Sequence, residues 1–397
     1  MNSISINYPK IPHWNAVFSL FMGVTSLISA EFIPISLLTN IANELHITEG
    51  QAGQSVTAVG VLAVITSLLI APLTTKINPR HILLTFSATL IISNLLVALS
   101  PNFTILLIGR SLLGICVGGF WSLISAITLQ LVPQQNVPRA LSVIYAGVSV
   151  ATIIALPFAS YLGDLLGWRT IFYLSALLGV LTLVWQYITL PTLSTNNKSN
   201  FKEMVNLLNQ SWVITGLIAI ICSYAGYHIF FTYMKPFLQY NLNLSHGGLT
   251  TTLFCFGIIN CFGTLIASFF INRSFQTTMI SIHIILGIVA VAFLFNQHSF
   301  FENIITVLLW AFIFGIIPVG WSTWIARTLP KQAEMAGGFM VASIQLSITL
   351  AAALGGMIFD HYGVPALFLT AACIFIMAIT FTYLSFSLLY KITKEKI

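Results

Sequence analysis

Residues 103–131 read FTILLIGRSLLGICVGGFWSLISAITLQL, an apolar run in which Arg110 is the only charged residue. A helix that spans a bilayer needs about 20 mostly apolar residues, so this run is long enough to cross a membrane. The rest of the chain has the same character, because its 397 residues are 57% hydrophobic and 6% charged. Soluble domains carry about 25% charged residues. The composition therefore predicts a protein surrounded by lipid.

Eleven further apolar runs divide the chain into two sets of six. The first set comprises Asn15–Leu38, Ala52–Ile70, Ile82–Leu99, Phe103–Leu131, Ala140–Leu162 and Thr170–Leu190. The second comprises Trp212–Phe237, Gly248–Ile271, Met279–Phe295, Ile304–Ala326, Gly337–Phe359 and Ala366–Tyr390. We therefore expect an all-α membrane protein of 12 transmembrane helices. Its six-helix halves would be residues 1–190 and 212–397, joined by a cytoplasmic linker at 191–211.

Lysine and arginine gather in alternate connections, which predicts the orientation in the membrane. With both termini in the cytoplasm, Arg169 is the only basic residue in an outer loop, and Arg110 and Lys235 lie in or near spans. The cytoplasmic side then holds Lys10, Lys76, Arg80, Arg139, Lys198, Lys202, Arg273, Arg327, Lys331, Lys391, Lys394 and Lys396. Cytoplasmic loops carry such an excess. We expect a multi-pass protein of the cell inner membrane.

The two sets of runs share short motifs. Asp-x-x-Gly occurs at the outer end of the fifth run, at Asp164, and again at the eleventh, at Asp360. Trp-Ser occurs in the fourth run at Trp121 and in the tenth at Trp321. Two similar halves in parallel orientation are typical of secondary transporters that alternate access around a central site.

Glu31 and Arg110 are charged residues expected inside the bilayer. Glu31 lies about nine residues, or roughly 13 Å, from the outer end of its run, and Arg110 lies at a similar depth. Charges at such depth cost roughly 2.5–3.5 kcal/mol on insertion scales and mark functional sites. We predict a Glu31–Arg110 pair, direct or through water, that acts in proton coupling. The alternative is a static ion pair that only holds helices together.

Aromatic and polar side chains predict a substrate cavity. Trp121 and Trp321 are repeat-mates whose rings, with neighbouring hydroxyls, suit a flat ligand with polar edges; packing is the alternative for each. The other residues assigned to the cavity are Ser122, Tyr227, His228, Ser322, Trp324, Asn260 and Gln345. His228 could bind substrate or transfer protons, or be a neutral core histidine. The amides of Asn260 and Gln345 could instead join helices.

Several kinds of function are not indicated. The chain has no HExxH, P-loop, GxSxG or carboxylate cluster, so we expect neither an enzyme nor a cofactor other than the proton gradient. The five cysteines lie in apolar runs without ligand spacing, and the loop histidines, with His283 near a helix end, do not pair at metal spacing. Scattered basic residues do not suggest a nucleic-acid partner. We expect a monomer whose partners are lipid, protons and a small substrate.

Arg110-x-x-x-Gly114 resembles the proton-coupling signature of the major facilitator superfamily. The fifth run, with Pro157 ahead of Gly163, is similar to the antiporter motif of its drug and proton antiporter branch. The resemblance implies the major facilitator fold, with Pro34, Gly114, Gly118 and Pro157 at packing or hinge positions. The loop at 71–80 departs from the family pattern, because it keeps Lys76 and Arg80 but lacks the Asp and Gly that usually precede them.

Within that branch, four stretches resemble bacterial purine ribonucleoside exporters. They are EFIPISLLT at 31–39, EGQAGQSVT at 49–57, GGFW at 118–121 and PVGWSTW at 318–324. The resemblance implies proton-driven export of inosine and guanosine. The rival hypotheses are an exporter of drugs or sugars with the same fold and, in another class, a membrane receptor or scaffold without transport.

Overall fold

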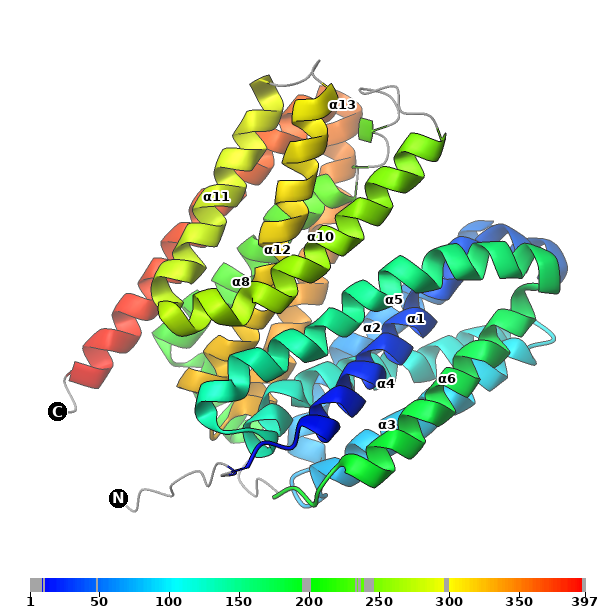
Figure 1. Cartoon of the computed structure of the whole chain (residues 1–397), viewed down its shortest axis with the longest axis horizontal. Coiled ribbons are helices and arrows are strands. Elements are labelled where there is room, and N and C mark those ends of the chain that lie inside the picture. The colour runs from blue at the N-terminus through cyan, green and yellow to red at the C-terminus, as the bar shows by residue number, and fades with distance from the viewer. Residues whose placement is uncertain are drawn as a thin grey trace. The chain divides into compact units, whose positions relative to one another are not determined.

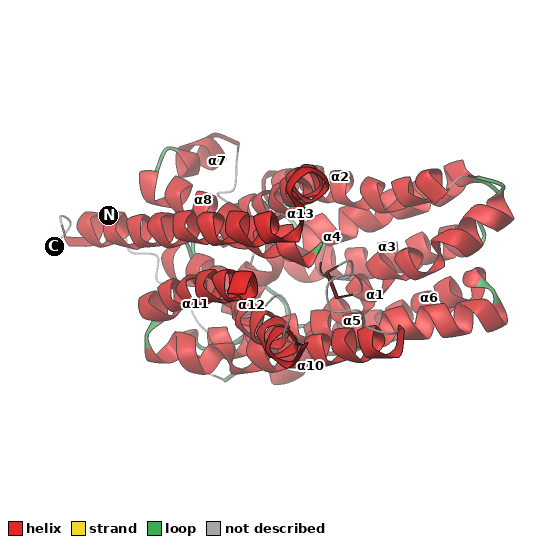
Figure 2. Ribbon diagram, turned by 90° about the horizontal axis from the view of Figure 1, so that it is seen from above, coloured by secondary structure: helices red, strands yellow, loops and turns green. Residues whose placement is uncertain are grey.

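The structure, a computed structural model, describes residues 9, 11–47, 49–194, 201–232, 234, 237–238, 246–295 and 300–394. Throughout this part of the chain the regular structure is helical and no strand occurs, as the drawing by secondary structure shows (Figure 2). Twelve segments of it are long and apolar enough to cross a membrane. The prediction of an all-α protein with 12 transmembrane helices is confirmed.

The described residues form two compact units. One comprises Met1–Phe201 with Ser322–Ala342, and the other Lys202–Trp321 with Ser343–Ile397. The boundary at Phe201 lies inside the expected linker, and the short segment Ser322–Ala342 groups with the first unit. The division at 1–190, 191–211 and 212–397 stays a prediction.

Six long helices build the first unit (Figure 1). They are α1 (Trp14–Leu45), α2 (Glu49–Leu73), α3 (Pro79–Ala98), α4 (Phe103–Leu131), α5 (Val137–Leu166) and α6 (Trp168–Thr189), with the 3-10 turn η1 (Gln134–Asn136) before α5. α1 packs against α5 and α6, while α4 packs against α2 and α3. Most of α4 is buried, so this helix is the centre of the unit.

The remaining helices lie wholly or mostly in the second unit. They are α7 (Phe201–Leu208), α8 (Ser211–Phe231), α10 (His246–Arg273), α11 (Phe275–Phe295), α12 (Phe300–Thr328) and α13 (Ala333–Lys394). α13 contains two spans, Ala333–Phe359 and His361–Ile392, which meet at a kink at Gly363. The last turns of α12 and the first turns of α13 belong to the first unit.

The repeated Asp-x-x-Gly motif has the same backbone role in both places. Gly167, at the end of α5, has φ 82° and ψ 149°, and Gly363 has φ 73° and ψ −172°. Among the described glycines, these are the two with positive φ. This region of φ and ψ is open to glycine and strained for other residues, so in both places the motif's glycine provides the backbone conformation that separates one span from the next.

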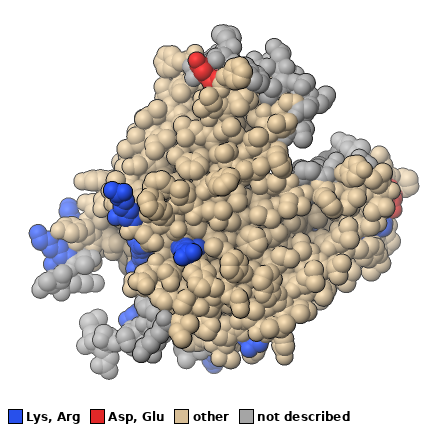
Figure 3. Space-filling model, in the orientation of Figure 1, with Lys and Arg blue, Asp and Glu red and all other residues tan. Residues whose placement is uncertain are grey.

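Apolar side chains cover much of the surface. Large hydrophobic residues such as Phe158, Ile188 and Ile288 are more than half exposed. On the face drawn in Figure 3, few atoms belong to charged residues. Such a surface would not be stable in water, because soluble proteins rarely expose large contiguous apolar patches. Its natural solvent is the hydrocarbon of a bilayer.

Three details differ from the sequence-based expectations. α1 continues to Leu45, past the expected end at Leu38, so Glu31 lies nearer the middle of its helix. The linker, read as a polar stretch, contains the short helix α7. His283, expected near a helix end, lies well inside α11 and is fully buried.

Candidate functional site

Pro34 gives α1 a backbone carbonyl that the helix itself cannot satisfy. In an α-helix the carbonyl of residue 30 accepts from the N–H of residue 34, and proline has no N–H. Pro34 lies inside α1, which leaves the Ala30 carbonyl without its usual donor. An unsatisfied carbonyl is costly in hydrocarbon, so a neighbouring helix must supply a donor.

Arg110 on α4 supplies that donor. Its Nη1 donates to the Ala30 carbonyl at 2.7 Å, and its Nη2 donates to the Glu31 carbonyl at 3.0 Å. The Nε of Arg110 donates to the Ser55 carbonyl of α2 at 3.2 Å. The side chain is 1% exposed. The Arg110 guanidinium therefore joins α4 to the backbones of two neighbouring helices, α1 and α2.

The Glu31 carboxylate does not form an ion pair with this guanidinium. Among described residues, the one ion pair joins Arg169 to Glu44, at 2.6 Å, near helix ends. Arg110 instead reaches the backbone of the turn that carries Glu31. Of the two forms of the pair that the sequence predicts, the direct one is absent in this structure, and the one through water stays a prediction. Glu31 as a residue is partly buried, whereas Arg110 is almost fully buried.

Gly114 and Gly118 let α4 approach α2 closely enough for this arrangement. A side chain at Gly114 would meet the Val59 carbonyl at 2.6 Å. A side chain at Gly118 would clash with the backbone of Ala63. Small residues at a helix interface are the usual means of close packing in membranes. The spacing of four residues places both glycines on the face of α4 that holds Arg110.

Trp121 lies on α4 and its ring is partly open. It stacks on Tyr145 of α5, with ring centroids 4.9 Å apart and an interplanar angle of 25°. The Tyr145 hydroxyl shares a hydrogen bond of 2.7 Å with the Ser322 hydroxyl, also in the first unit. Ser122, Ser322 and Trp324, all expected in the cavity, are buried. Of the tryptophan and serine candidates in this unit, Trp121 is therefore the one accessible to a ligand.

Trp321 is fully buried in the second unit and takes part in a chain of hydrogen bonds. Its Nε1 donates to the Ser223 hydroxyl at 3.2 Å, which lies 2.6 Å from Nε2 of His283. Nδ1 of His283 lies 2.6 Å from the Met279 carbonyl. A carbonyl only accepts, so Nδ1 of His283 bears a hydrogen. The Ser223 hydroxyl, which has a single hydrogen, lies 2.6 Å from both the Ala219 carbonyl and Nε2 of His283. The chain fixes the position of the indole.

Tyr227 and His228 belong to an aromatic cluster between α8 and α12. Tyr227 is buried and stacks on Phe314 at 3.3 Å between centroids, with an interplanar angle of 9°. His228 is partly buried, and its ring meets Tyr227 edge to face at 5.0 Å. Within the described part of the chain, His228 is surrounded by aromatic rings, and its ring nitrogens have no hydrogen-bond partner there. It is therefore open to a ligand's polar edge.

The remaining predicted residues have separate positions. Asn260 on α10 donates from Nδ2 to the Ala311 carbonyl of α12 at 2.9 Å, which joins these helices. Gln345 lies partly buried on α13. Pro157 lies in α5, but its side chain is outside the described residues. The predicted cavity residues are divided between the two units, and a cavity shared by all of them stays a prediction.

Sequence reasoning missed Tyr145, Ser223 and His283. Tyr145 and Ser223 had no signal, because a single hydroxyl in an apolar run is common. His283 had one, since a histidine several residues inside a membrane helix must find hydrogen-bond partners. Groups of three or more potential metal ligands are absent from the described residues.

Comparison with known proteins decides the family. Residues 16–334 match the family model described as Major Facilitator Superfamily. The chain belongs to this superfamily. It is therefore a multi-pass membrane transporter and not an enzyme. Members with solved structures share the fold: the human organic anion transporter MFSD10 (TETRAN) matches 94% of this chain and 100% of its own, with a TM-score of 0.75 at 15% identity.

The proton:xylose symporter XylE is similar in the same way. Its structure covers 94% of this chain and 95% of its own, with a TM-score of 0.76 at 14% identity. Relatives with higher identity within the superfamily are named purine ribonucleoside efflux pump NepI. The relative from Shigella sonnei is 41% identical over 355 residues, 89% of this chain and 90% of its own. The relative from Salmonella enteritidis is 38% identical over 366 residues, 92% of each chain.

Proposed function

We propose that this transporter exports purine ribonucleosides such as inosine and guanosine across the bacterial inner membrane, driven by protons that flow inward. Both termini would face the cytoplasm, and the protein would act as a monomer. The substrate class follows from the relatives named purine ribonucleoside efflux pump, which cover about nine tenths of this chain. The observation that supports proton coupling is the position of Glu31 beside the Arg110 cluster.

Glu31 is the group that we assign to proton transfer. The residue is partly buried, and the adjacent Arg110 guanidinium is fully buried and donates to three backbone carbonyls. A nearby positive charge favours the ionised carboxylate, and loss of water favours the protonated one. A shift of α4 against α1, or a change in the access of water, would therefore change the proton affinity of Glu31 between the two states of the cycle.

The cycle then has a simple order. Facing outward, Glu31 would gain a proton and substrate would leave. Facing inward, the proximity of Arg110 would favour loss of the proton, and substrate could bind. The nucleoside base would stack on the partly open ring of Trp121. Arg110 would act by holding the Pro34 turn in place, because its bonds go to the backbone on each side of Glu31.

Inverted membrane vesicles provide the test. An acidic lumen and alkaline medium reproduce the outside and the cytoplasm, so radiolabelled inosine should accumulate in vesicles that contain the protein. Dissipation of the pH gradient should abolish this accumulation. Excess unlabelled guanosine should compete, whereas xylose or a cationic dye should not. Inosine accumulation that does not depend on the pH gradient would contradict the proposal. Competition by xylose or a cationic dye as strong as that by guanosine would also contradict it.

A further inference from the structure

α10 and α12 of the second unit cross tightly near mid-span. A side chain at Gly263 of α10 would clash with the backbone carbonyl of Phe312 on α12. Across the same contact, a side chain at Gly315 would meet the backbone nitrogen of Thr264 at 2.8 Å. α10 continues from this crossing to its end at Arg273, and α11 begins two residues later.

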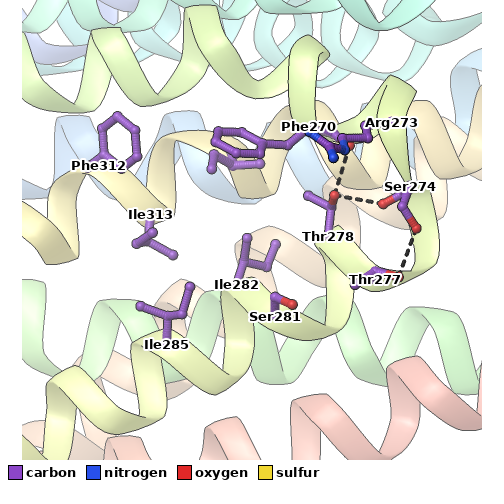
Figure 4. Close-up of a pocket in the computed structure, with 11 residues that line it drawn as sticks. Phe270, Arg273, Ser274, Thr277, Thr278, Ser281, Ile282, Ile285, Phe312 and Ile313 are labelled. Carbon is purple, nitrogen blue, oxygen red and sulfur yellow. Dashed lines mark hydrogen bonds between the residues drawn. The ribbon is translucent and has the colours of Figure 1, made fainter.

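A cavity of about 380 Å³ is lined by residues of α10, α11 and α12 and of the turn between α10 and α11 (Figure 4). Its inner wall consists of the aliphatic side chains Ile282, Ile285, Ile313 and Ile316 with Phe270 and Phe312. Its mouth consists of Arg273, Ser274, Thr277, Thr278 and Ser281. The cavity is therefore divided into a polar end and an apolar end.

The hydroxyls at the mouth are held in place by the turn between α10 and α11. The Thr278 hydroxyl donates to the carbonyls of Phe270 and Ser274 at 2.9 and 2.7 Å, and the Ser274 hydroxyl donates to Thr277 at 2.8 Å. Arg273 is exposed, and its guanidinium has no ion pair or hydrogen bond with the described residues. The Thr278 and Ser274 hydroxyls have thus donated their hydrogens within the turn, so the donors that the mouth offers are the Arg273 guanidinium and the hydroxyls of Thr277 and Ser281.

The depth of the cavity fits the membrane interface. Ile282 lies seven residues and Ile285 ten residues into α11, or roughly 10 and 15 Å from its start at 1.5 Å per residue. The helices α10 and α11, which line the cavity, also expose Phe262, Phe269, Ile284 and Ile288. An occupant of the mouth could thus extend its apolar part over a surface that faces hydrocarbon.

We propose that this cavity binds an anionic phospholipid, with the phosphate at Arg273 and the mouth hydroxyls and one acyl chain along the wall formed by Ile282, Ile285, Ile313 and Ile316. The charge of Arg273 and the hydroxyl donors suit the phosphate and polar headgroup of such a lipid, and the apolar wall suits its acyl chain. Basic pockets between transmembrane helices bind anionic headgroups in this way. The site belongs to the second unit, apart from Glu31 and Arg110, so it is independent of the proposed transport function.

Native mass spectrometry of the detergent-solubilised full chain provides the test, with phosphatidylglycerol and phosphatidylcholine as probes. We expect one phosphatidylglycerol to bind in preference to phosphatidylcholine. Arg273→Gln should weaken this binding about fivefold, the effect of one basic residue at a charged headgroup. Lys391→Gln, which removes an exposed charge at the end of α13, is the matched control and should leave binding unchanged.

A second variant separates the cavity from its charge. Ser281→Phe places a ring in the cavity while Arg273 remains, and it should also weaken phosphatidylglycerol binding. Glycerol 3-phosphate at equal concentration should not displace the lipid, because it lacks the acyl chain. Equal binding of the two lipids, undiminished binding in both variants, or displacement by glycerol 3-phosphate would each overturn the proposal.

Discussion

Trp121 and Trp321 occupy the same place in the two sequence repeats, but the structure gives them different surroundings. Trp121 is partly open and stacks on Tyr145 in the first unit. Trp321 is fully buried in the second, with its N–H bonded to Ser223. A repeated motif therefore predicts the position of a residue on its helix and leaves its role to the residues around it. We infer that Trp121 meets substrate and that Trp321 stabilises the second unit.

Replacement of Trp321 should have the largest effect on stability. Trp321→Ala removes a fully buried indole and leaves the Ser223–His283 pair without its donor, so we expect a loss of about 3–5 kcal/mol in the free energy of unfolding. Unfolding in mixed micelles would measure it. Trp185→Ala removes an exposed indole and is the control, with little expected change. Similar losses in both variants would contradict the assignment of Trp321 to the core.

Trp121→Ala should act on binding instead. We expect nucleoside affinity to fall by about 1–3 kcal/mol, the scale of a lost stack between a base and an aromatic ring. Trp121→Phe should recover part of this affinity, since it keeps an aromatic face. Equilibrium binding of labelled inosine to purified protein would measure both. If Trp121→Ala has normal stability and unchanged affinity for inosine, Trp121 only packs against its neighbours.

The glycines of the Asp-x-x-Gly motif differ from the two tryptophans, because Gly167 and Gly363 have similar surroundings. A Cβ at Gly167 meets nothing within 4 Å, and one at Gly363 meets only Pro365, at 3.8 Å. The cost of alanine is therefore backbone strain, about 1–3 kcal/mol at either position. Thermal unfolding should show similar losses for Gly167→Ala and Gly363→Ala. Gly287→Ala is the control, because Gly287 lies in a regular helix with ordinary contacts and its replacement should not lower the stability. Unequal losses of stability in Gly167→Ala and Gly363→Ala would contradict the view that the two glycines have the same role.

A double-mutant cycle tests the link between Pro34 and Arg110. Arg110→Ala should destabilise the protein, because the Ala30 carbonyl loses its donor. In a Pro34→Ala background the restored N–H of residue 34 can take over, so the cost of Arg110→Ala should fall by about 1 kcal/mol. Arg139→Ala, at an exposed arginine, should show no such coupling. Equal costs of Arg110→Ala in both backgrounds would contradict the proposed bond.

The fold could be predicted from the sequence because a single strong physical constraint, the membrane, determines it. Hydrocarbon requires long apolar helices, so the twelve spans could be read from composition and length. The linker helix α7 was missed because its eight residues are too few and too polar for that signal.

The site was only partly accessible. Depth in the membrane and charge identified Glu31 and Arg110 as neighbours, but they did not predict that Arg110 donates to the Ala30 carbonyl. That hydrogen bond depends on the carbonyl freed by Pro34 and on the approach of α4 permitted by Gly114. The burial of Trp321 depends on Ser223 and His283, which lie on other helices and follow no spacing rule.

The most direct test of the account is the pH-driven transport of the Glu31→Gln protein. Glutamine keeps the size of the protonated side chain and cannot lose a proton, so accumulation of inosine in inverted vesicles with an acidic lumen should be abolished. Any remaining exchange of inosine should not depend on pH. Glu302→Gln, at an exposed residue in the first turn of α12, is the control and should transport normally. Full pH-driven accumulation by Glu31→Gln, at normal membrane expression, would contradict the account.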